Sequence, residues 1–130
     1  MIVLRPSKIE GVGCFTLVPI QKAQKIELLW DGDDFRLMTD EEMARYELDP
    51  VLRQVVDRYC VPAREGWYVP QTFSRMSVGW YLNHSTSPNV EEDAERNFVA
   101  LRDIEVDEEL TIDYDVLVED GRRGVKTEGR

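Results

Sequence analysis

The sequence predicts a mainly β (α+β) domain in which short strands surround one helical insert. Three observations support this prediction: short runs of β-branched and aromatic residues, glycine and proline breaks between them, and no alternation of strands with long helices. The last observation argues against a doubly wound parallel sheet. The length of 130 residues and the apolar content of 42% fit a single folded domain.

The first thirty residues predict a small antiparallel or meandering β unit. Its strands are expected at 2–4, 14–18 and 26–30, where aliphatic and aromatic residues gather. Gly11-Val12-Gly13 separates the first two strands, and a polar stretch from Pro19 to Lys25 separates the second from the third.

Residues 39–60 predict a helical insert. Thr39 followed by Glu42 matches a capping box, so a short helix should begin there. A second helix should begin with Asp49 as its N-cap and Pro50 in its first turn. The apolar face of this second helix is formed by Leu52, Val55, Val56 and Tyr59.

After the insert the pattern returns to β-type. Short apolar pieces suitable for strands occur at 67–69, 78–82, 98–101 and 110–112. Residues 119–130 contain three glycines and almost no apolar groups, so we expect a flexible tail there. The predicted folded domain is therefore 1–118.

Composition argues against several classes of protein. No apolar run approaches the roughly 20 residues that span a bilayer, and the stretch from Met1 to Pro6 is too short for a signal peptide. We therefore expect a cytoplasmic or other intracellular protein. Cys14 and Cys60 stand far apart in the sequence with no second thiol or histidine nearby, so neither a metal site nor a disulfide is indicated.

The net charge of −10 is unevenly distributed along the chain. Residues 91–120 alone carry 13 acidic and 2 basic groups. Such a field repels a phosphate backbone and attracts basic groups, which argues against direct nucleic-acid binding and for a lysine-rich peptide partner. The alternative is that these acids only keep strand and turn surfaces soluble.

Three strings contain the residues best suited to chemistry. Gly11-Val12-Gly13 permits a positive φ and a close backbone approach, although such a pattern often marks only a turn. Asn83-His84-Ser85-Thr86-Ser87-Pro88-Asn89 contains the only histidine, and by itself it fits a structural turn. The string from Glu108 to Asp115 fits, in isolation, an edge strand with a half-buried tyrosine at its end.

Taken in order, these strings resemble those of the SET-domain protein lysine methyltransferases. In that family a G-x-G turn, an N-H-S-x-x-P-N string and an E-E-L-T-x-D-Y string recur in the same order. The resemblance covers about residues 5–115, including the piece Ala100–Ile104 before the last string. It implies a SET-type β-clip fold of small curled sheets with a knot-like crossing of the last two strings. It also implies a minimal SET domain without zinc-binding flanking modules.

The resemblance implies that S-adenosylmethionine binds on one face and that a lysine of a basic, histone-like protein enters a channel from the other. Backbone groups that would hold the methionine part of the cofactor belong to Glu10, Gly11, Val12 and Gly13. Asn83 would contact its amino group, and the backbone of His84 would contact its adenine. Tyr114 would be the catalytic tyrosine, while Ile112 and Tyr81 would line the substrate channel. If the source is eukaryotic, a nuclear or chromatin-associated protein is the expectation.

The chemistry of methyl transfer explains why these residue types suffice. Displacement at a sulfonium methyl by an amine needs no covalent intermediate, so positioning and electrostatics supply most of the acceleration. Free lysine has a pKa of roughly 10.4, and a dry channel beside the sulfonium favours the neutral amine. The resemblance also implies that the side chain two residues before the catalytic tyrosine limits how many methyl groups fit beside the lysine nitrogen. That residue is Ile112, which brings no hydroxyl that would hold a water, so we expect di- or trimethylation.

The sequence departs from the family pattern at three positions. Thr86 stands where a cysteine is usual and Asp107 where a glycine is usual, and both fall in turns. Trp80 replaces an arginine common on the cofactor side.

In the family, a segment after the catalytic tyrosine normally closes the lysine channel with an aromatic residue. No aromatic residue follows Tyr114 here, so the resemblance implies that another group closes the channel. The alternatives are the Trp67-Tyr68 region, Tyr46 or Tyr59 of the insert, or a second subunit in a homodimer. A non-catalytic SET-like module that binds a basic peptide or a partner subunit is the rival to an enzyme. A third alternative is an enzyme that acts on a free amine or a ribosomal protein.

Overall fold

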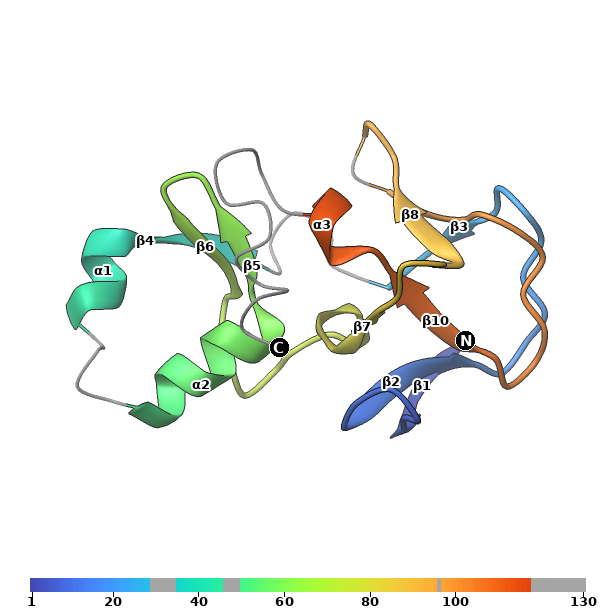
Figure 1. Ribbon diagram of the computed structural model, residues 1–130, viewed down its shortest axis with the longest axis horizontal. Helices are drawn as coiled ribbons and strands as arrows, with labels where there is room; N and C mark the ends of the chain where they lie inside the picture. The colour runs from blue at the N-terminus through green and yellow to red at the C-terminus, as the bar shows by residue number, and fades with distance from the viewer. Residues whose placement is uncertain (29–34, 46–49, 96, 118–130) are drawn as a thin grey trace. The chain divides into compact units, whose positions relative to one another are not determined.

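The computed structural model describes residues 1–28, 35–45, 50–95 and 97–117, which fall into two compact units (Figure 1). The motif unit comprises Met1–Leu29 and Ser77–Asp113, and it contains the three strings up to Asp113. The insert unit comprises Trp30–Met76 and Tyr114–Arg130. The domain boundary at residue 118 stays a prediction, and the expected tail lies outside the described residues.

Four strands form the first sheet of the motif unit, in the order β1-β2-β10-β7. They are β1 (Ile2–Pro6), β2 (Val12–Thr16), β7 (Asn83–His84) and β10 (Glu109–Ile112). β2 pairs antiparallel with both β1 and β10, whereas β7 and β10 run parallel, with Asn83 opposite Thr111 and His84 opposite Ile112. The interpretation of the Glu108–Asp115 string as an edge strand is therefore wrong, because β10 has β2 on one side and β7 on the other.

A second sheet of the motif unit is antiparallel, in the order β3-β9-β8. Its strands are β3 (Lys25–Ile26), β8 (Val90–Glu92) and β9 (Phe98–Ala100). The strand predicted at 26–30 is shorter than expected, because Glu27 and Leu28 lie outside β3. Residues 29 and 30 lie outside the described residues.

The apolar run at 78–82, predicted as a strand, instead forms the 3₁₀ helix η1 (Val78–Tyr81). The N–H of Trp80 donates to the carbonyl of Ser77 at 3.2 Å, as the tight helical turn requires, and the N–H of Gly79 donates to the carbonyl of Leu28 at 2.8 Å. The run therefore buries Trp80 by coiling rather than by joining a sheet. Periodicity alone does not separate the two outcomes for so short an apolar piece.

The insert unit contains one antiparallel sheet in the order β4-β6-β5, and helices. Its elements are β4 (Phe35–Thr39), α1 (Asp40–Arg45), α2 (Pro50–Tyr59), β5 (Val61–Ala63), β6 (Gly66–Pro70) and α3 (Tyr114–Leu117). The predicted capping box is confirmed in part, since the N–H of Glu42 donates to Thr39 Oγ1 at 3.1 Å. The second predicted helix is also present, although its expected N-cap, Asp49, lies outside the described residues.

Short strands in small sheets, with few and short helices, confirm the predicted fold class within the described ranges. The knot-like crossing stays a prediction. No helix in the described part of the chain is long and apolar enough to cross a membrane.

Candidate functional site

The loop between β1 and β2 is closed by Ser7. Its N–H donates to the carbonyl of Gly11 at 2.8 Å, and its hydroxyl accepts from the N–H groups of Ile9 at 2.9 Å and Glu10 at 3.4 Å. Gly11 has a φ of 50°, in the left-handed region that glycine adopts without steric cost. The first string is therefore a fixed turn whose backbone conformation requires glycine.

Asn83 fastens β7 to this loop. Its Nδ2 donates to the carbonyls of Glu10 at 3.0 Å and Val12 at 3.1 Å, and to Oε2 of Glu109 at 3.0 Å. All three partners are acceptors, so they determine which end of the amide faces them. The other end, Oδ1, accepts no hydrogen bond from any described residue and is available to a ligand that donates one.

Glu109 completes this group, although no sequence pattern assigned it a role of its own. Its carboxylate accepts from Ser7 Oγ, at 2.8 Å to Oε1 and 3.0 Å to Oε2. A Cβ built on Gly13 would lie 2.1 Å from Glu109 Oε2 and 3.1 Å from Asn83 Nδ2, so only glycine fits there without a shift. Its partners Ser7 and Asn83 are distant in the sequence, so no local pattern could have indicated this role.

Asn89, the last residue of the second string, ties that string to β10. Its Oδ1 accepts from the N–H of Thr111 at 2.8 Å, and its Nδ2 donates to the carbonyl of Glu109 at 2.8 Å and to Glu108 Oε2 at 3.1 Å. Its side chain is buried, with 2% of the residue exposed. Between the two asparagines, the N–H of Ser87 donates to Ser85 Oγ at 3.0 Å, as in a hydroxyl-closed turn.

The acids that precede β10 are paired with arginines. Arg102 Nη2 lies 2.5 Å from Glu108 Oε2, and this hydrogen bond lowers the pKa of the Glu108 carboxyl and raises that of the guanidinium. Arg5 Nη1 lies 2.8 Å from Asp107 Oδ1. Asp107 has a φ of 68°, which explains why the family pattern favours glycine at this position.

The other two departures from the family pattern differ in their setting. Thr86 is exposed, so the loss of a cysteine there changes the surface only. Trp80 is 3% exposed and is part of the apolar core of the motif unit. The arginine of the family pattern is thus replaced by a core side chain.

The parallel pairing of β7 with β10 places His84 opposite Ile112, two residues before Tyr114. His84 Nδ1 lies 3.9 Å from Asp113 Oδ1. Ile112 is 3% exposed, whereas Tyr81 is half-buried at the end of η1. The motif unit thus brings together the Glu10–Gly13 loop, Asn83 and the strand that precedes the tyrosine.

Tyr114 belongs to the insert unit, where it is the first residue of α3 and is 1% exposed. Among the aromatic side chains considered as a channel wall, Trp67 is buried, with the Arg53 guanidinium carbon 5.7 Å from its ring centroid. Tyr59 is half-buried beside Arg58. Tyr46 lies outside the described residues.

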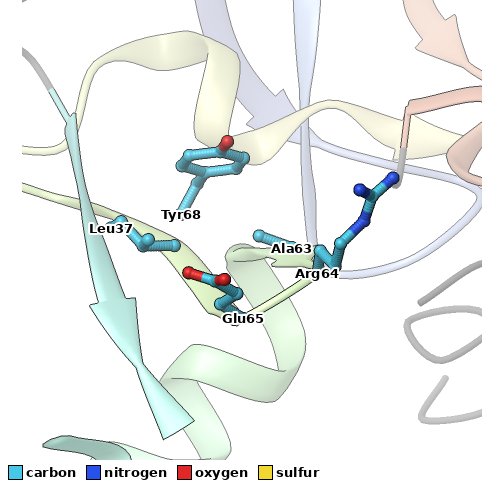
Figure 2. Close-up of a pocket in the computed structure, with 5 residues that line it drawn as sticks. All are labelled: Leu37, Ala63, Arg64, Glu65 and Tyr68. Atoms are coloured by element: carbon cyan, nitrogen blue, oxygen red, sulfur yellow. The ribbon is translucent and has the colours of Figure 1, made fainter. Parts of the chain in front are cut away.

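A pocket of about 350 Å³ opens in the insert unit beside Tyr68 (Figure 2). It is lined by Leu37, Ala63, Arg64, Glu65 and Tyr68. Figure 2 shows the tyrosine ring facing this hollow, with the Arg64 and Glu65 side chains diverging from the hairpin turn between β5 and β6. Of the two residues in the Trp67-Tyr68 region, Tyr68 is therefore the one that a ligand can reach.

Both cysteines are buried, as free thiols. Burial, assisted by the charge of Glu109, raises the pKa of the Cys14 thiol to about 12, and its Sγ donates to the carbonyl of Val78 at 3.0 Å. This thiol is therefore a structural group rather than a nucleophile. Within the described ranges, no cluster of three or more histidine, cysteine or acidic residues is arranged to hold a metal ion.

Comparison with known proteins agrees with this architecture. The family model for the SET domain matches residues 11–115, so the chain belongs to the SET domain family. A Plasmodium falciparum protein described as a candidate histone methyltransferase has a similar structure, with a TM-score of 0.55 and 25% sequence identity. The similarity covers 87% of this chain and 91% of that one.

Two further solved structures share the fold at lower identity. The Neurospora SET domain protein DIM-5, a histone lysine methyltransferase, has a TM-score of 0.57 and 21% identity over 87% of this chain and 51% of that one. The polycomb repressive complex 2 of Chaetomium thermophilum has a TM-score of 0.59 and 23% identity over 88% of this chain. Only 15% of that polycomb chain is spanned. No curated protein matches the sequence.

Proposed function

We propose that this protein transfers methyl groups from S-adenosylmethionine to a lysine amine of a basic protein substrate. Membership of the SET domain family supports methyltransferase activity in general, as does the match to most of the Plasmodium candidate histone methyltransferase. One observation carries the proposal furthest. Asn83 Nδ2 donates to the carbonyls of Glu10 and Val12 in the glycine loop and to Glu109 of β10, which leaves Asn83 Oδ1 available to a ligand.

The motif unit offers groups that suit the cofactor. Asn83 Oδ1 is an acceptor, which matches the ammonium group of the amino-acid part of S-adenosylmethionine. The turn held by Ser7 would present the backbone of Glu10–Gly13 to the same part, and the backbone of His84 would contact the adenine. When bound, the cofactor supplies an electrophilic methyl group on a sulfonium.

Tyr114 is the proposed catalytic residue that orients the lysine amine. Its side chain is almost fully buried, so its hydroxyl would act in dehydrated surroundings where a lysine more easily loses its proton. The hydroxyl would align the lone pair and hold the methyl group through weak C–H contacts to oxygen.

Ile112 and Tyr81 would line the channel. Ile112 is buried and offers no hydroxyl that would hold a water, so we propose di- or trimethyl products. The Trp67-Tyr68 region, Tyr46 and Tyr59 stay alternatives for the remaining wall of the channel. A homodimer remains the alternative that would complete it.

The substrate is proposed to be basic because of the acidic segment. Glu91, Glu95, Asp103 and Glu105 are exposed, so they are free to raise the local concentration of a lysine-rich segment. Transfer to basic proteins should therefore weaken as salt rises from about 0.05 to 0.5 M, since screening shortens the range of these charges. Transfer that does not depend on salt would indicate that the acidic segment only keeps the surface soluble. An intracellular histone-like protein fits this chemistry.

The decisive experiment incubates the protein with labelled S-adenosylmethionine and a panel of basic proteins that includes histones. Wild type should transfer label, and Tyr114→Phe should lose at least about 100-fold in rate while it still binds the cofactor by calorimetry. Mass spectrometry of the product counts the methyl groups, and monomethyl product alone would contradict the role of Ile112.

The rival function has its own signature in the same experiment. A SET-like binding module would retain basic peptides without transferring label, and its affinity would not change in Tyr114→Phe. Absence of cofactor binding by wild type would overturn the methyltransferase proposal.

A further inference from the structure

The half-buried Glu109 carboxylate differs from the neighbouring acids Asp107 and Glu108 because it has only neutral partners. Those partners are the Ser7 hydroxyl and the Asn83 amide, and a Cβ at Gly13 would collide with it. No described arginine, lysine or histidine lies within ion-pair distance of it.

Other acids nearby show what an ordinary arrangement looks like in this protein. Asp107 pairs with Arg5 and Glu108 pairs with Arg102. A partly buried carboxylate with only neutral donors lacks the compensation that a paired cation gives to its neighbours. The field of this charge is felt inside the motif unit, where it helps to keep the Cys14 thiol protonated.

We infer that Glu109 is a positioning residue that orients the Asn83 amide and makes the glycine-loop site selective for ligands with a positively charged amino-acid part. The inference rests on the proposed function, because S-adenosylmethionine is the ligand with this chemistry. In this role the Glu109 carboxylate of β10 adds a negative charge to a site that otherwise offers backbone groups and the Asn83 amide.

The hydrogen bonds explain the positioning part of this role. Asn83 Nδ2 has two hydrogens and three acceptors around it, and the only charged one is the Glu109 carboxylate. A charged acceptor binds an amide more strongly than a carbonyl does, so it holds the amide plane and with it the direction of Oδ1. The negative charge of Glu109 also attracts an ammonium group that donates a hydrogen bond to Asn83 Oδ1. This attraction is stronger than in bulk water because the surroundings are partly desolvated.

Glu109→Gln separates the charge from the shape. With its amide oxygen in the place of Oε2, glutamine can still accept from both Asn83 Nδ2 and Ser7 Oγ, so the group keeps its packing and loses its charge. Glu109→Ala removes both. Glu105→Gln is the matched control, because it deletes the same charge from an exposed position in the same acidic segment.

The test compares dissociation constants of two ligands by calorimetry on the full chain. S-adenosylmethionine carries the ammonium, and 5′-methylthioadenosine has the same nucleoside but no amino-acid part. Glu109→Gln should weaken S-adenosylmethionine at least about tenfold and leave 5′-methylthioadenosine within about twofold, since only the charged ligand loses a partner. Glu105→Gln should bind both ligands as wild type does.

A second measurement needs no ligand. Amide hydrogen exchange at Ile9, Glu10 and Gly11 should speed up in Glu109→Ala, which frees the loop, and stay near wild type in Glu109→Gln. Equal weakening of both ligands by Glu109→Gln, or no change in either, would overturn this inference while leaving the methyltransferase proposal in place. Failure of wild type to bind S-adenosylmethionine would overturn both.

Discussion

The motif unit and the insert unit bury different kinds of side chain. All buried polar residues among the described ones belong to the motif unit, namely Thr16, Asn83, Asn89 and Thr111. The buried residues of β4, α1, α2, β5 and β6 are apolar, proline or glycine: Met38, Met43, Val56, Pro62, Ala63, Gly66, Trp67, Val69 and Pro70. Cys60, between α2 and β5, is buried as well.

The two kinds of buried side chain place different demands on the geometry of their surroundings. Hydrogen bonds to buried amides fix distances and directions, and a half-satisfied network is costly. Apolar packing specifies volume and tolerates changes of shape. The unit that contains the proposed cofactor site therefore adds buried directional contacts to an apolar core, whereas β4, α1, α2, β5 and β6 of the insert unit rely on apolar packing for their buried side chains.

The largest effect on stability is expected for Gly66→Ala in the insert unit. The new Cβ would lie 2.0 Å from the carbonyl oxygen of Met38 and 2.8 Å from the Cα of Thr39, which are backbone atoms of the partner strand. The pairing of β4 with β6 must open, at a cost of about 3 kcal/mol in the free energy of unfolding. Chemical denaturation measures this loss, and a value below about 1 kcal/mol would contradict the tight approach of the strands.

Asn89→Leu comes next and tests the polar network of the motif unit. The change leaves the N–H of Thr111 and the carbonyl of Glu109 without their side-chain partner at a buried position. We expect a loss of about 2 kcal/mol in the free energy of unfolding. Val56→Ala is the matched test of apolar packing in α2, and its loss should be accompanied by unchanged cofactor binding.

Gly13→Ala should reverse the pattern of Gly66→Ala. Here the colliding atoms are the end of the flexible Glu109 side chain, which can swing away. The stability loss should stay below about 1 kcal/mol, while the displaced Glu109 and Asn83 lose their orientation and cofactor affinity falls at least about tenfold. Calorimetry and thermal unfolding on the same sample test this prediction, and retained affinity would show that the carboxylate is not needed where it lies.

The smallest effect is expected from acid pH at the paired surface of the motif unit. The pKa of Glu108 is lowered below its ordinary value of 4.5, chiefly by the hydrogen bond from Arg102, so the native state favours the charged form. Its contribution is present above about pH 4.5 and is lost as the pH falls through the native pKa.

Comparison of wild type with Glu108→Gln measures this contribution. Since the Glu108 side chain is 28% exposed, the difference should be less than about 1 kcal/mol at neutral pH. It should shrink as the pH falls below about 4.5 and through the lowered native pKa. A difference that grows on acidification would contradict the assigned direction of the pKa shift.

Much of the fold and of the candidate site could be predicted from the sequence where a pattern has a local cause. The capping box at Thr39, the proline at the start of α2 and the glycine turn at Gly11 depend on neighbouring residues only. Residues 61–63 gave no strand signal, because a proline inside a run lowers its strand propensity. Residues 78–82 were predicted as a strand but form η1, because the N–H of Gly79 donates to the carbonyl of Leu28, which is far away in the sequence.

The role of Glu109 was hidden for the same reason. Its partners, Ser7 and Asn83, are distant in the chain, and they meet only because β10 lies between β2 and β7. The family motif placed the right strings in order. It did not indicate which acid of the string faces the loop.

The central place of β10 also determines when the motif unit can be completed during synthesis. β1 and β2 emerge first and can form a hairpin, yet β7 has no described strand to pair with in that sheet until residues 109–112 have been made. The β5–β6 hairpin joins neighbouring residues and needs no such delay. Because closing long loops slows folding, the insert unit can fold before the last strand of the motif unit has been synthesised.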